Sequence, residues 1–76
     1  MGIPTQVNFL DERISYNSSR QEEYHGWALI GSPADKPVWL IRKTFYNTDK
    51  QKTHHHFTNK VFAFNQVWND RASLSY

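Results

Sequence analysis

The sequence of 76 residues contains no cysteine and only three glycines and three prolines. Without cysteine, no disulfide can brace the fold and no thiolate can bind zinc or act as a nucleophile. Hydrophobic residues make up only 38% of the chain, so one copy can bury little apolar surface. A domain this small stands near the limit of independent stability, which favours burial against partner chains.

Long apolar runs are also missing. The longest runs, such as Val38–Ile41, have four residues, whereas a helix that crosses a bilayer needs about 20 such residues. The first residues lack the basic start and apolar stretch of a signal peptide. We therefore expect no membrane partner and no export signal.

The motifs of enzymes are equally scarce. The sequence has no G-x-S-x-G elbow and no glycine-rich phosphate loop. Its paired carboxylates, Asp11-Glu12 and Glu22-Glu23, are neighbours in sequence and would point opposite ways on an extended chain. We expect neither catalysis nor a bound cofactor.

Aromatic residues, by contrast, reach 16% of the chain. Each large ring buries on the order of 150–250 Å² when it is packed, so a few rings can dominate a small core. We expect the core and the assembly contacts to come from six of these side chains: Trp27, Trp39, Trp68, Phe45, Phe57 and Tyr76.

The hydrophobic pattern predicts a mainly β protein with a small antiparallel sheet, either a meander or a hairpin. Alternation of side chains predicts strands over 24–31, 38–47 and 53–64, with polar turns between them. The spacing of Phe64 and Trp68 predicts one short helical turn near residues 65–71, with Trp68 as the plug of the core. Residues 1–23 read as an extended N-terminal arm, with a short strand near 6–10, and residues 24–76 as a small β domain.

Charge is distributed unevenly about a net value of +2. Residues 1–35 carry a net charge of −3 and residues 42–60 one of +4. The interpretation that we favour is a solvated, lysine-rich hairpin tip, because lysine protects exposed strand edges from aggregation. The basic segment is also compatible with nucleic acid or with the acidic half of a neighbouring copy.

The nucleic-acid interpretation has candidate residues. Arg42, Lys43 and Lys60 are interleaved with Phe45 in the predicted hairpin, an arrangement typical of proteins that bind single strands. The simpler interpretation, which we favour, places Phe45 and Phe57 in the core.

Two further groups of residues have possible roles. His54 and His56 project to one side of a strand and are metal candidates, but a zinc site needs at least three protein ligands, so we expect no metal. Asp70 and Arg71 are adjacent near the C-terminal carboxylate. We expect them to form an ion-paired anchor for the last segment, with a surface pair of little energy as the alternative.

Several segments of the second part of the chain carry a resemblance. They are the Tyr24, Gly26 and Ala28 strand, the Gly31-Ser32 loop, the strand Val38–Lys43, the run Phe62–Asn65 and the terminal decapeptide Val67–Tyr76. With them the chain resembles, over about residues 24–76, a family of small uncharacterised proteins encoded by tailed bacteriophages. The resemblance implies a viral origin.

Together these features predict a structural component of a tailed-phage virion, located in the capsid, neck or tail. It would act by packing on other virion proteins in many copies. One alternative is a phage accessory protein that binds single-stranded nucleic acid. Another is a small inhibitor of a host protein.

Overall fold

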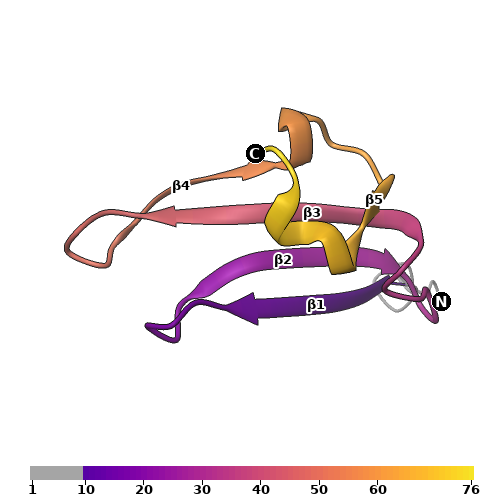
Figure 1. Ribbon diagram of the computed structural model, residues 1–76, viewed down its shortest axis with the longest axis horizontal. Coiled ribbons are helices and arrows are strands. Elements are labelled where there is room, and N and C mark those ends of the chain that lie inside the picture. Colours follow the sequence, from indigo (N-terminus) through magenta and orange to yellow (C-terminus); the bar gives the residue numbers. More distant parts are fainter. Residues whose placement is uncertain (1–9) are drawn as a thin grey trace, which may run out of the picture.

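The computed structural model describes residues 10–76, and its strands form one antiparallel sheet (Figure 1). Four strands follow one another across the sheet in chain order, and a short fifth strand pairs with the start of the third. The strands are β1 (Leu10–Tyr16), β2 (Glu22–Leu29), β3 (Pro37–Tyr46), β4 (Lys52–Phe57) and β5 (Gln66–Val67). Two 3₁₀ turns, η2 (Thr58–Lys60) and η3 (Trp68–Ser73), complete the described part.

The same turn closes both long hairpins. Asn17 after β1 and Asn47 after β3 each accept two backbone N–H bonds on the side-chain oxygen, the second from the glutamine four residues on, at 3.0 Å. Arg20 and Lys50 take the same left-handed conformation, with φ of 63° and 65°. The sequences Asn-Ser-Ser-Arg-Gln and Asn-Thr-Asp-Lys-Gln thus encode one turn twice, because asparagine side chains readily bond backbone a few residues ahead.

One face of the sheet carries the core. Tyr24, Ala28, Trp39 and Ile41 project from β2 and β3 and are buried with Trp68 of η3. The C-terminal segment crosses this face of the sheet (Figure 1). The rings of Trp39 and Trp68 pack with centroids 5.9 Å apart, and the Trp39 indole N–H donates to the carbonyl of Pro33 at 3.0 Å.

Several sequence predictions are confirmed. The protein is mainly β with an antiparallel sheet. β2 and β3 lie within two residues of the predicted strands 24–31 and 38–47. η3 supplies the short helical turn, although it begins three residues later than the predicted 65–71 because residues 66–67 form β5. Trp68 in this turn is 5% exposed, as expected of a plug. No helical turn within residues 10–76 has the length and hydrophobicity needed to cross a membrane.

The boundary between an arm and a β domain at residue 23 differs from the structure. Residues 10–16 form β1, which pairs with β2 from Leu10↔Leu29 to Tyr16↔Glu22, so the sheet begins well before residue 24. The Asn17 turn, which fixes this hairpin, explains why a segment rich in charge still forms a strand. Residues 1–9, and with them most of the short strand predicted near 6–10, lie outside the described residues.

The predicted return strand 53–64 is too long. β4 ends at Phe57, and in the following η2 turn Asn59 and Lys60 adopt left-handed backbone conformations with φ of 53° and 59°. The chain therefore leaves the edge of β3. Phe62 and Phe64, predicted within the strand, are instead 69% and 46% exposed.

Candidate protein interface

The second face of the sheet, which we call the open face, points away from Trp39 and Trp68. Alternation along β2 and β3 places apolar side chains here as well as in the core, because both strands are apolar on both sides at one end. Leu29 and Phe62 are 66% and 69% exposed. The apolar end of the open face is lined by Leu10, Trp27, Leu29, Val38, Leu40, Phe57, Phe62 and Phe64.

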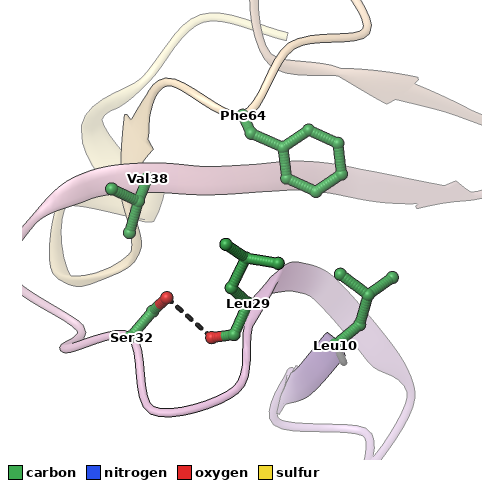
Figure 2. A pocket seen from close by; sticks show the side chains of 5 residues that line it. All are labelled: Leu10, Leu29, Ser32, Val38 and Phe64. Carbon is green, nitrogen blue, oxygen red and sulfur yellow. Dashed lines mark hydrogen bonds between the residues drawn. The ribbon is translucent and has the colours of Figure 1, made fainter. Parts of the chain in front are cut away.

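The first hollow on the open face has a volume of about 490 Å³. Figure 2 shows the side chains of Leu10, Leu29, Val38 and Phe64 around it. The polar side chain in this lining, Ser32, donates its hydroxyl to the carbonyl of Leu29 at 2.6 Å (Figure 2). Because that hydroxyl already has an acceptor, the hollow presents an apolar surface.

A second hollow of about 300 Å³ shares Leu10 and Phe64 with the first. Phe62 forms part of its wall, with its ring edge-on to Phe57 at 5.2 Å between centroids and to Phe64 at 6.0 Å. Trp27 and Leu40 of β2 and β3 also line it. The two hollows together form an apolar groove, which we call the open-face groove.

A polar network borders this groove. Glu22 accepts from Arg42 Nη2 at 3.1 Å and from Thr44 Oγ1 at 3.3 Å, and His25 Nε2 lies 2.8 Å from Glu12 Oε1. Burial raises the pKa of Glu22, but the Arg42 hydrogen bond and the charges of His25, Arg42 and Lys52 outweigh it and leave that pKa below 4.5. Glu22 is therefore an ionised carboxylate when it pairs with Arg42.

The network also fixes the orientation of Trp27. The His25 ring stacks on the Trp27 ring with centroids 3.9 Å apart, and the Arg42 guanidinium lies 5.2 Å from the Trp27 centroid. Cations favour the face of an indole ring. A large aromatic side chain is thus held in place at the centre of the open face, between the apolar groove and the charged network.

Of the six aromatic residues predicted for the core and the assembly contacts, some lie in or against the core and others lie on the open face. Trp39 and Trp68 lie in the core, and Tyr76 packs against it with its ring centroid 5.6 Å from that of Tyr24. Trp27 and Phe57 line the open face instead, because Trp27 is opposite Leu40 in the β2–β3 register and not opposite Trp39. Phe45 is half-buried further along β3.

The predicted nucleic-acid residues are not gathered at one site. Arg42 and Lys43 are neighbours on β3 and point to opposite faces, and Arg42 is paired with Glu22. Lys43 lies 5.2 Å from the Phe45 centroid, and Phe45 stacks on His54 at 4.7 Å. Lys60 belongs to the η2 turn.

The two metal candidates lie close together on β4. The rings of His54 and His56 are 4.9 Å apart between centroids, and both pack against Phe45. His25 points to the opposite face of the sheet. Within residues 10–76, no three histidine or carboxylate side chains are grouped as a metal site would require.

The expected Asp70–Arg71 ion pair is not formed between these side chains. Arg71 lies over the Trp68 ring at 4.6 Å and donates to the Trp68 carbonyl at 3.2 Å, because η3 turns it back onto the core. The Tyr76 hydroxyl donates to the Arg71 carbonyl at 2.9 Å. The C-terminal segment is therefore held by cation–aromatic and backbone contacts.

The sequence prediction missed the groove residues Leu10, Leu29, Val38 and Phe64. One available signal was the apolar character of β3 on both faces at its start, where Val38 and Leu40 alternate with Trp39 and Ile41. Neither family models nor curated proteins nor solved structures match this chain.

Proposed function

We propose that the protein is a small structural component of a tailed-phage virion, which packs on neighbouring virion proteins through its open face. The observation that carries this proposal is the open-face groove. It exposes apolar side chains to solvent although the chain has a low content of hydrophobic residues. Contiguous apolar patches of this kind mark binding surfaces on soluble proteins.

The composition of the open face fits a protein partner. Trp27, Phe62 and Phe64 are aromatic side chains of the type that dominates the binding energy of protein interfaces. The charged network of Glu22, His25 and Arg42 lies beside them, as polar groups do at the rim of an interface. Covering the apolar groove would contribute about 25 cal/mol for each Å² removed from water.

The resemblance to tailed-phage proteins over residues 24–76 supports the virion as the proposed place of action. A virion repeats each of its parts many times, so that weak contacts of single copies add up across the assembly. This multiplicity suits a chain whose groove is shallow and whose own core is small.

A second candidate function is the binding of single-stranded nucleic acid. Its support is the side-by-side placement of Lys43, Phe45, His54 and His56 on the face opposite the groove. A cation beside stacked rings is the arrangement that such binding uses. Titration of single-stranded DNA at several salt concentrations tests it: affinity that falls steeply with salt supports it, and no binding at low salt rejects it.

Mass spectrometry of purified phage particles tests the proposed function. We expect the wild-type protein in many copies per particle. The double change Phe62→Ser and Phe64→Ser should remove most of it, whereas Tyr16→Ser should leave the copy number unchanged. Tyr16 is also an exposed aromatic, 62% exposed, but lies at the far end of β1 from Leu10.

Absence of the wild-type protein from particles would overturn the proposal. Recovery of the protein from infected cells in complex with nucleic acid, or with a host protein, would then identify which alternative holds.

A further inference from the structure

The outer edge of β1 is an unpaired strand edge. β1 stands first in the sheet order, and no strand within residues 10–76 pairs with its far side. Such an edge exposes a row of backbone N–H and C=O groups that can pair with another strand. Proteins usually blunt these edges with charged residues or proline. β1 has no proline, and its charges are of both signs, Asp11 and Glu12 beside Arg13, so they can pair with those of a second copy and need not repel it.

Two copies of β1 can be aligned antiparallel so that Glu12 of one copy lies opposite Glu12 of the other. In this alignment the two strands have complementary sequences. In that register Asp11 lies opposite Arg13 of a second copy, and Arg13 lies opposite its Asp11. Leu10 of each copy likewise lies opposite Ile14 of the other copy. Opposite charges and apolar pairs directly across a strand pair both stabilise a sheet.

Alternation places Asp11 and Arg13 together on the core face of β1, as this pairing requires. In a single copy the Arg13 guanidinium lies 5.5 Å from the Trp39 centroid, toward the interior of its own sheet, so the pairing requires this side chain to turn outward to the edge of the strand. Within residues 10–76 neither side chain belongs to an ion pair. Leu10 and Ile14 are 38% and 42% exposed on the other side of the strand.

We propose that two copies of the chain pair through β1, antiparallel and with Glu12 beside the two-fold axis. The two Glu12 carboxylates do not meet, because each is held toward its own β2 by His25 Nε2 at 2.8 Å. The contact is isologous and closes on itself as a dimer. A two-fold axis perpendicular to the sheet leaves both open-face grooves on the same side.

The other sheet edge does not offer this symmetry. β4 has the sequence Lys-Thr-His-His-His-Phe, which contains no acidic residue to oppose its lysine and histidines. Two β4 strands side by side would therefore form no pair of opposite charges. Self-pairing is therefore assigned to β1.

Charge reversal with complementation in trans tests the proposal. Asp11→Lys alone places two lysine–arginine contacts in the dimer, and Arg13→Glu alone places two aspartate–glutamate contacts, so each should weaken dimerisation by at least about tenfold. An equimolar mixture of the two variants restores opposite charges at both contacts. We therefore expect a heterodimer in sedimentation velocity measurements of the mixture.

Matched controls are Asp49→Lys and Lys36→Glu, which make the same charge changes at exposed positions outside β1 and should leave dimerisation unchanged. Circular dichroism verifies that each variant is folded, since Asp11 also accepts the Gly31 N–H at 3.0 Å. Asp11→Asn keeps that acceptor and loses the charge. It should weaken the dimer about threefold if Asp11→Lys proves unfolded.

Three results would overturn the proposal: a wild-type protein that stays monomeric at high concentration, a dimer indifferent to both reversals, or variants that remain monomeric when mixed. None of these results bears on the groove, because the reversed residues do not line it. Loss of virion incorporation in the Phe62 and Phe64 variant with the β1 dimer intact would separate the two proposals.

Discussion

The indole ring of Trp68 lies directly on the backbone of Gly26. A Cβ placed on Gly26 would stand 2.6 Å from Cε3 and 2.7 Å from Cζ3 of that ring, closer than carbon atoms pack. The glycine thus lets η3 seat its tryptophan against β2. Trp39 confines the space further, since the same Cβ would lie 3.2 Å from its Cε3.

Gly26→Ala should therefore destabilise the protein by about 1–3 kcal/mol, the usual range for an overpacked core. Urea unfolding followed by tryptophan fluorescence measures the change. Trp68→Phe provides the control background, because the smaller ring leaves room for the added methyl group. If Gly26→Ala lowers the free energy of unfolding by the same amount in the Trp68→Phe background, then Trp68 is not the residue that excludes a side chain at position 26.

Glu22 should make the stability depend on pH in the acid range. Its folded pKa lies below the ordinary value of 4.5, so its stabilising effect is present above that value and is lost as the pH falls through the lower folded value. Glu22→Gln should cost about 1–2 kcal/mol at neutral pH, because Arg42 loses a charged partner. The difference from wild type should narrow in acid.

Chemical unfolding at a series of pH values measures this effect. Glu23→Gln is the matched control, since Glu23 forms no ion pair with any residue of the range 10–76. Equal pH dependence in the Glu22 and Glu23 variants would contradict the assigned role of Glu22.

The hydroxyl group of Tyr76 should lose its proton only at a pH above the ordinary range for tyrosine. Burial raises the pKa of its hydroxyl to about 12, although Thr58 and Arg71 lower it in part. The folded protein keeps this proton where the unfolded chain loses it, so stability should fall as the pH rises from about 10 to about 12. Tyrosinate absorbance should show a last phase that Tyr76→Phe removes.

Tyr76→Phe also removes the hydrogen bond to the Arg71 carbonyl. It should therefore lower the free energy of unfolding by about 0.5–1.5 kcal/mol at neutral pH. Tyr16→Phe is the control, because the Tyr16 side chain is exposed. A late phase that persists in Tyr76→Phe would assign it to another tyrosine.

The elements predicted best from the sequence were those whose alternation is strong. β2 and β3 have large side chains at every second position, and Trp68 follows a clear change of period. β1 was missed because charged residues at 11–13 hide its alternation, and because its pairing depends on the Asn17 turn. The end of β4 was missed because a left-handed Lys60 has no strong signature in sequence.

The apolar character of β3 on both sides indicated a second apolar surface, but the residues that form the open face could not be predicted, because they depend on strand register. Whether Trp27 joins Trp39 or faces away from it is decided by the pairing of Trp27 with Leu40. Alternation within each strand leaves that choice open. The positions of Phe62 and Phe64 likewise depend on a turn that redirects the chain after β4.

Site-specific photo-crosslinking in phage-infected cells tests the central claim, that the open-face groove contacts a virion protein, most directly. A photoreactive amino acid in place of Phe64, which lines both hollows, should give crosslinks to a structural protein of the particle. The same group in place of Asp49, at the exposed tip of the β3–β4 hairpin, should give none. Crosslinks from position 64 to nucleic acid or to a host protein, or no crosslinks at all, would contradict it.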